Sequence, residues 1–191
     1  MEQIKEEQSS AIILKIILIG DKNVGLSTFY DKYCNGNKFV SSLNTIGVDF
    51  SVKIFDTQTS SGFNFWHLAS GSRFNSIRQY YLSNSQGGII MFDIANHESF
   101  YNIEKFFQSM VNCNQGFFSC IVLGNKIDLR NHKLNCVTDK EAEDYCTKLS
   151  ENFKRGNIRI KYFPVSVLSE LNIEKSLTYL YQSLISQYLK E

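Results

Sequence analysis

The chain has 191 residues, 43% hydrophobic and 20% charged, which is typical of one globular domain with a sizeable core. Its net charge is +1 and its basic residues are scattered, so nothing favours nucleic acid or an acidic membrane as a partner. The five cysteines show no C-x-x-C spacing and the three histidines no H-E-x-x-H pattern, which gives zinc chemistry no support; without a signal peptide, we expect reduced cysteines in a cytoplasmic protein.

The first part of the chain is predicted to contain three strands and one helix. Residues 12–19 form a short apolar, β-branched run that ends at Gly20, which is typical of a central parallel strand. A helix is expected over residues 27–36. Residues 48–55 and 63–68 alternate or run apolar on either side of a turn, and they predict a hairpin-like pair of strands.

The second part of the chain continues with alternating strands and helices. Further strands are predicted at residues 88–94, 117–123 and 158–165. Asn96 is a candidate N-cap of one helix, and the capping-box spacing of Thr138 and Glu141 starts another that runs to about Leu149. Apolar residues at helical spacing predict the last helix: Ile173, Leu177, Leu180, Leu184, Ile185 and Tyr188. This alternation indicates a mostly parallel α/β sheet covered on both faces, with ligands at the carboxyl ends of its strands.

Residues 20–28, GDKNVGLST, follow a predicted strand and open a predicted helix, and we call them the phosphate loop. Two glycines would let successive backbone N–H groups face a phosphate, beside the positive end of the helix. Ser27 stands where a hydroxyl would bind Mg²⁺. Leu26 occupies the place of the usual lysine, so this segment alone is equally typical of an ordinary strand–turn–helix connection.

Residues 125–128, here the NKID segment, follow another predicted strand. The carboxylate of Asp128 could accept both the ring N–H and the exocyclic amine of guanine, whereas adenine would present a mismatched edge. The alkyl stem of Lys126 could lie against the base, and Asn125 could tie this segment to the phosphate loop. The motif is short, and its position in the same sheet as the phosphate loop strengthens the interpretation.

The order and spacing of five segments resemble those of small GTPases of the Rab family: GDKNVGLST, TIGVDF, WHLASGSRFNSIRQYY, GNKID and PVSVLSELNIEKS. The resemblance extends from about Lys15 to Tyr188. It implies the P-loop small-GTPase fold, a mostly parallel six-stranded sheet with five helices on both faces, in a single domain over residues 1–191 with its core at about 12–189. It also implies a guanine-nucleotide switch that binds GDP or GTP with Mg²⁺.

Site residues follow from the resemblance position by position. The nucleotide-binding residues would be Gly20, Lys22, Asn23, Val24, Gly25, Ser27, Thr28, Asn125, Lys126, Asp128, Ser166 and Val167. Ser27 and Thr45 would bind the metal ion, and the backbone N–H of Val167 would reach the guanine oxygen. Effectors or regulators would bind a switch face that contains Ile46, Phe50, Trp66 and Tyr80. Grouped aromatic residues are favoured anchors of an interface, although any one of them alone is more often a half-buried core residue.

The departures from the family pattern fall on the phosphate, magnesium and water positions. Leu26 replaces the lysine on the β- and γ-phosphates, and His67 replaces the aspartate that orients a magnesium-bound water. Ser70 replaces a glycine that meets the γ-phosphate, and Gly71 replaces the glutamine that orients the attacking water. No catalytic residue is therefore assigned. Leu168 replaces a lysine and leaves base packing weaker or purely apolar.

Three interpretations of Lys22 remain open: it could supply the charge missing at Leu26, point into solvent, or fill the space of the γ-phosphate. The chain ends in SQYLKE without the prenylated cysteines usual in the family, so membrane association would need a lipidated tail beyond this sequence.

The leading hypothesis is a Rab-like guanine-nucleotide-binding protein with weak or absent GTP hydrolysis, cytoplasmic or on vesicle and endomembrane surfaces. The alternatives are a pseudo-GTPase that binds no nucleotide and serves as an interaction module, and a competent GTPase with an altered site.

Overall fold

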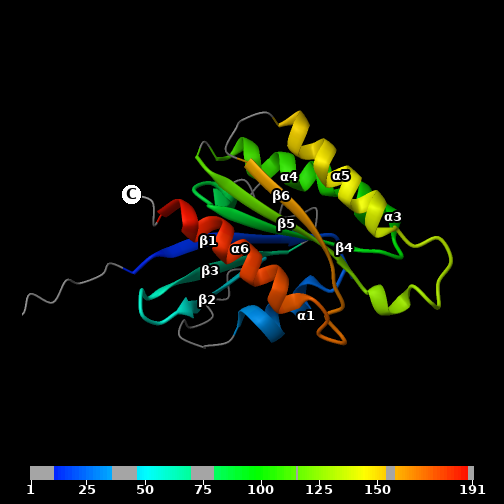
Figure 1. Ribbon diagram of the computed structural model, residues 1–191, viewed down its shortest axis with the longest axis horizontal. Helices are drawn as coiled ribbons and strands as arrows, with labels where there is room; N and C mark the ends of the chain where they lie inside the picture. Colours follow the sequence, from blue (N-terminus) through cyan, green and yellow to red (C-terminus); the bar gives the residue numbers. More distant parts are fainter. Residues whose placement is uncertain (1–10, 36–46, 70–79, 115, 154–157, 189–191) are drawn as a thin grey trace, which may run out of the picture.

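The computed structural model describes residues 11–35, 47–69, 80–114, 116–153 and 158–188 (Figure 1). Its strands are β1 Ile13–Gly20, β2 Val48–Asp56, β3 Ser61–Leu68, β4 Gly87–Asp93, β5 Phe118–Asn125 and β6 Ile158–Pro164. They form one six-stranded sheet in the order β2-β3-β1-β4-β5-β6. Only the β2–β3 pair is antiparallel among these strands. The predicted α/β fold class is thus confirmed.

Helices cover both faces of the sheet (Figure 1). They are α1 Leu26–Phe29, which continues into the π-helical turn η1 Tyr30–Cys34, then α3 His97–Tyr101, α4 Ile103–Asn112, the 3-10 turn η3 Ile127–Leu129, α5 Asp139–Asn152 and α6 Ile173–Tyr188. Figure 1 shows α3, α4 and α5 on one face and α1 and α6 on the other. None of the helices within the described ranges is long and apolar enough to cross a membrane.

Each face of the sheet has its own hydrophobic core, because side chains alternate along each strand. On β1, Ile17 and Ile19 belong to the core under α4 and α5, whereas Ile16 and Leu18 belong to the core under α1 and α6. All eight residues of β5 are buried, as expected for a central strand covered on both sides.

The predicted helix starts are confirmed at two positions. The side chain of Asn96 accepts hydrogen bonds from the backbone N–H groups of Glu98 and Ser99 at 3.0 and 3.3 Å. Thr138 Oγ1 accepts one from the backbone N–H of Glu141 at 3.1 Å. These side chains satisfy N–H groups that have no partner within the helix.

Two predicted helices differ in detail from the structure. The helix expected over residues 27–36 is a short α-helix followed by a π-turn, which Asn35 closes by donating its N–H to the carbonyl of Tyr30 at 2.9 Å. The helix after Asn96 divides at Asn102, whose side chain donates to Asp21 Oδ2 at 2.8 Å. The break therefore connects this helical region to the phosphate loop.

The parallel strands β1, β3, β4 and β5 all end at the same edge of the sheet. Gly20 pairs with Met91, and Asp93 pairs with Asn125, so the phosphate loop and the NKID segment leave the sheet two strands apart. The fold thereby brings the two motifs to one edge, as the strand-end argument predicted.

Gly62 lies where β1, β2 and β3 approach one another. Its N–H donates to the carbonyl of Ile12 at 3.0 Å, and an added Cβ would overlap the carbonyl oxygen of Lys53. Since that neighbour is backbone, it cannot move aside easily.

We expect Gly62→Ala to destabilise the protein by about 1–3 kcal/mol, the usual cost of overpacking a close contact. Urea unfolding followed by circular dichroism would measure it. Gly116→Ala is the matched control, because nothing lies within 4 Å of the added Cβ there. Equal stability of the two variants would contradict the argument.

Candidate functional site

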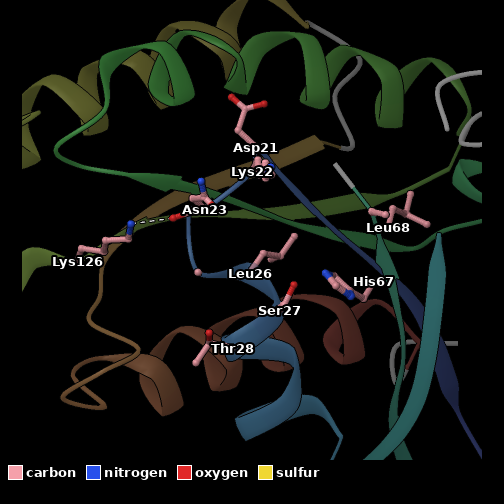
Figure 2. A pocket seen from close by; sticks show the side chains of 12 residues that line it. Asp21, Lys22, Asn23, Leu26, Ser27, Thr28, His67, Leu68 and Lys126 are labelled. Carbon is pink, nitrogen blue, oxygen red and sulfur yellow. Dashed lines mark hydrogen bonds between the residues drawn. The ribbon is translucent and has the colours of Figure 1, made fainter. Parts of the chain in front are cut away.

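A pocket of about 530 Å³ opens at the carboxyl ends of β1 and β3 (Figure 2). Its described lining consists of Gly20, Asp21, Lys22, Asn23, Gly25, Leu26, Ser27, Thr28, His67, Leu68, Ala69 and Lys126. It thus brings together the phosphate loop, the end of β3 and the lysine of the NKID segment. Thr45, Ser70 and Gly71, which the sequence also assigned to this site, lie outside the described residues, as does Ile46 of the predicted partner face.

Gly25 sets the curve of the phosphate loop. Its φ is +96°, in the region that favours glycine, and the preceding turn carries Asn23 at φ 66°. An added Cβ at Gly25 would overlap the side-chain amide nitrogen of Asn125. Both the backbone conformation and the lack of space therefore require glycine at this position.

Asn125 joins the phosphate loop to the loop after β6. Its Nδ2 donates to the carbonyl of Val24 at 2.8 Å, and its Oδ1 accepts from the backbone N–H of Val167 at 3.0 Å. The residue is only 2% exposed. The predicted tie between the NKID segment and the phosphate loop is confirmed, and it extends to a third segment.

The N–H of Val167 has a different partner from the one the sequence suggested. We expected it to reach a guanine oxygen, but it is given to Asn125, and Val167 itself is buried. In this arrangement Val167 positions the amide of Asn125. Its neighbour Leu168 is 80% exposed.

Lys126 spans the outer edge of the pocket (Figure 2). Its Nζ donates to the carbonyl of Asn23 at 2.7 Å and to Asp93 Oδ2 at 2.7 Å. The charge is thereby neutralised by Asp93, and the alkyl stem is held along the pocket wall. Sequence reasoning missed Asp93, although its place at the end of β4 beside Asn125 was a usable signal.

Asp128 lies outside the pocket lining and is exposed. Its Oδ1 accepts a hydrogen bond from Ser166 Oγ at 2.6 Å, and that same oxygen of Ser166 accepts from the backbone N–H of Ser169 at 3.2 Å. Because Ser166 is fully buried, its hydrogen bond fixes the orientation of the Asp128 carboxylate. The second carboxylate oxygen makes no hydrogen bond within the described part of the chain.

Three phosphate-loop side chains differ sharply in environment. Asp21 lines the pocket, but its carboxylate is held by Asn102 and points away toward α3 and α4 (Figure 2). Lys22 is exposed. Leu26 is only 6% exposed and belongs to the core under α1 and α6, so the usual cationic position is occupied by an apolar packing residue.

His67 is packed into the pocket wall. Its ring stacks on Tyr30 with centroids 5.1 Å apart, and its Nδ1 lies 3.4 Å from Asp49 Oδ2. Burial lowers the pKa of the imidazole, an effect that the nearby Asp49 carboxylate partly opposes. The ring is therefore neutral near pH 7.

The donor set offers Mg²⁺ few of the oxygen ligands that it prefers. Among the described lining residues, Ser27 and Thr28 carry hydroxyl groups, whereas Asp21 is engaged elsewhere and His67 offers nitrogen. No group of three or more potential metal-ligating His, Cys, Asp or Glu side chains occurs in the described part of the chain. The set therefore fits Mg²⁺ poorly.

The predicted partner face is an aromatic stripe on β2 and β3. Trp66 stacks on Phe50 with centroids 5.7 Å apart, and its second aromatic neighbour is Tyr81 at 5.8 Å. The Nζ of Lys15 lies 4.3 Å from the indole centroid. Tyr80, which the sequence assigned to this face, is 81% exposed. Sequence reasoning missed Lys15 and Tyr81.

The strand order, the glycine-shaped loop and the NKID segment bonded to it define a P-loop fold of the small-GTPase class. The family model described as "Ras family" matches residues 15–186. Rab-27B of Rattus norvegicus is 27% identical over 176 residues, which cover 86% of this chain and 76% of that relative.

Two other relatives give a similar result. Rab-11B of Dictyostelium discoideum is 32% identical over 138 residues, covering 71% of this chain and 61% of that protein. Human Rab-3D is 27% identical over 158 residues, covering 81% and 72%. The chain therefore belongs to the Ras family, as a member of its Rab group.

We expect Asn125→Ala to destabilise the protein by about 1–3 kcal/mol, because the buried N–H of Val167 and carbonyl of Val24 both lose their partner. Urea unfolding would measure the change. Asn112→Ala, at an exposed position near the end of α4, is the control and should have little effect. An Asn125 variant as stable as this control would show that the amide does not hold the loops.

Proposed function

We propose that this protein is a guanine-nucleotide-binding member of the Rab group that acts through partner binding in vesicle trafficking, with weak or absent GTP hydrolysis. The observation that carries the proposal is the bonding of Asn125 and Lys126 to the backbone of the phosphate loop beside a pocket of about 530 Å³. A base held by the NKID segment and phosphates held by the loop would then lie in one continuous site.

Guanine selectivity is assigned to Asp128. Ser166 holds one of its carboxylate oxygens, and a carboxylate can accept two hydrogen bonds from the donor edge of guanine. The stem of Lys126, fixed by its bonds to Asn23 and Asp93, would support the plane of the base. Leu168, which stands where the family has a lysine, would add only weaker or purely apolar packing.

Phosphate binding would rest mainly on the backbone of the phosphate loop. Loss of the lysine at Leu26 removes a charge-assisted hydrogen bond of about 1.5–3 kcal/mol, which corresponds to roughly ten- to hundred-fold in affinity. A loop rich in N–H donors can bind a phosphate despite this loss. We therefore expect weakened rather than abolished binding, with Lys22 at most a small replacement for the missing charge.

Slow hydrolysis is inferred from the residues around the expected γ-phosphate. Gly71 has no side chain to orient a water, and Ser70 carries a side chain where the family has none. Leu26 is packed in the core and offers no charge to the transition state. These changes affect one function together, so we assign the protein to binding rather than catalysis.

Partner binding is assigned to the aromatic stripe. Phe50 and Trp66 stack beside each other on adjacent strands, and Tyr80 is exposed. Large aromatic residues of this kind are favoured interface anchors. Effectors or regulators of vesicle traffic are the partners that the Rab resemblance supports.

The nucleotide specificity is the first test. Nucleotide released from the purified protein by denaturation would be identified by chromatography, and GDP, GTP, ADP and ATP binding measured by calorimetry. We expect guanine nucleotides to bind more tightly, and Asp128→Ala to weaken GDP binding by roughly ten- to hundred-fold.

Asp144→Ala, at an exposed aspartate of α5, is the matched control and should leave GDP binding unchanged. Equal or tighter binding of adenine nucleotides would overturn the guanine assignment. No binding of any of the four would favour the alternative function, a nucleotide-free interaction module, for which the apolar burial of Leu26 is the supporting observation.

Hydrolysis provides a separate test. In a single-turnover assay of phosphate release from preloaded GTP, we expect a rate far below that of an ordinary Rab protein measured in parallel, because no described or predicted side chain orients the attacking water. An activating protein should change the rate little. A rate comparable with that of the reference Rab would place this protein among the competent GTPases.

A further inference from the structure

The NKID segment has a backbone conformation that needs support from its surroundings. Lys126 has a φ of 70° and a ψ of 34°, in the left-handed region that residues other than glycine rarely adopt. Such a conformation persists only where neighbouring contacts hold it. At the start of the segment, the amide of Asn125 and the Nζ of Lys126 make these contacts. At its end, after Asp128, they come from a separate group of side chains.

Arg130 ties the end of the segment to α5. Its backbone N–H donates to the carbonyl of Ile127 at 3.2 Å and closes the turn η3, which contains Asp128. Its guanidinium donates two hydrogen bonds to the carboxylate of Asp139, one of them from Nη1 to Oδ2 at 2.7 Å. Paired bonds of this kind fix both groups in orientation. Asp139 is the first residue of α5, where the positive end of the helix favours its negative charge.

Tyr162, on β6, completes the group. Its hydroxyl donates to Asp139 Oδ1 at 2.7 Å, and the residue is only 5% exposed. The hydrogen bond from Arg130 lowers the pKa of Asp139, whereas burial raises the pKa of Tyr162. Near pH 7 the carboxylate is therefore ionised and the tyrosine is a neutral donor. The three side chains thus join the turn η3, α5 and β6, which lies beside α5 (Figure 1).

The hydroxyl of Tyr162 also lies beside the start of the NKID segment. A Cβ added at Gly124, the residue before Asn125, would be 2.7 Å from this oxygen. The lack of a side chain at Gly124 therefore lets the tyrosine lie against the end of β5. One hydroxyl contacts the chain just before the segment, and through Asp139 it is bonded to Arg130 just after it. The group thereby holds the segment from both ends.

We propose that Arg130, Asp139 and Tyr162 form a clamp that fixes the NKID segment in its ligand-binding position, with Tyr162 as a positioning residue for the guanine base. The role toward the base rests on the proposed guanine binding by Asp128. None of the three clamp residues is among the described residues that line the pocket. They act on the ligand through the turn that carries Asp128, whose carboxylate must face the base at a defined angle.

Removing the hydroxyl of Tyr162 tests the positioning role. Tyr162→Phe keeps the ring, and calorimetry would compare GDP with inosine diphosphate, which lacks the exocyclic amine that Asp128 would accept. We expect GDP binding to weaken roughly three- to ten-fold and inosine diphosphate binding to weaken less, so that discrimination between them falls. Arg130→Lys keeps the charge, loses the paired geometry and should act in the same direction. Tyr101→Phe, at an exposed tyrosine, is the control and should leave both affinities unchanged.

Amide hydrogen exchange of the nucleotide-free protein tests the clamp without a ligand. The N–H groups of Ile127, Leu129 and Arg130 are hydrogen-bonded in and beside the turn. We expect Tyr162→Phe to speed their exchange roughly three- to ten-fold, while the N–H groups of the central strand β1 keep their rates. This comparison separates a local loosening of the NKID segment from a loss of global stability.

The outcomes distinguish the clamp from the guanine function. Unchanged exchange in the turn for both Tyr162→Phe and Arg130→Lys would overturn the clamp. Equal acceleration in β1 would contradict it too, because the group would then only support the global fold. Faster exchange in the turn with unaltered GDP affinity and discrimination would refute the positioning role. If the unmodified protein binds no GDP, the guanine function and the role toward the base both fail, and faster exchange in the turn would support the clamp alone.

Discussion

The buried amide of Asn125 is the contact on which the pocket depends. It holds the carbonyl of Val24 and the N–H of Val167, and thereby fixes the phosphate loop and the loop after β6 to the end of β5. The same amide lies so close to Gly25 that a side chain there would overlap it. A single buried polar group, satisfied on both of its sides, thus sets the shape of the loop, because leaving either side without a partner in the interior is costly.

The residues that replace the expected charged groups are integrated into the packing. Leu26 extends the core under α1 and α6, and His67 is stacked on Tyr30. The local chemistry has therefore shifted from hydrated charges toward apolar and aromatic contacts. A pocket wall of this kind favours ligands that are held by backbone N–H groups and by the imidazole. For this reason we propose nucleotide binding for the protein, but weak or absent GTP hydrolysis.

The β2–β3 hairpin links the pocket to the aromatic stripe. Successive side chains of a strand point to opposite faces, so Trp66 joins Phe50 and Tyr81 while its neighbour His67 turns to the pocket. On β2, Phe50 and Asp49 divide in the same way. A ligand that contacts His67 therefore touches the residue next to Trp66 in the chain. The same two strands, β2 and β3, carry both the pocket wall and the proposed partner face.

The sequence by itself determined the α/β class, the strand positions and the two loop motifs, because strand hydrophobicity, helix caps and glycine requirements are local properties. It also predicted that Asn125 ties the NKID segment to the phosphate loop. Only the tertiary structure decided that the N–H of Val167 is given to Asn125, that Asp93 holds Lys126, and that Tyr81 packs on Trp66. These contacts join residues distant in sequence across sheet edges and loops, and side-chain partners of that kind depend on register and packing, which a single sequence does not encode locally.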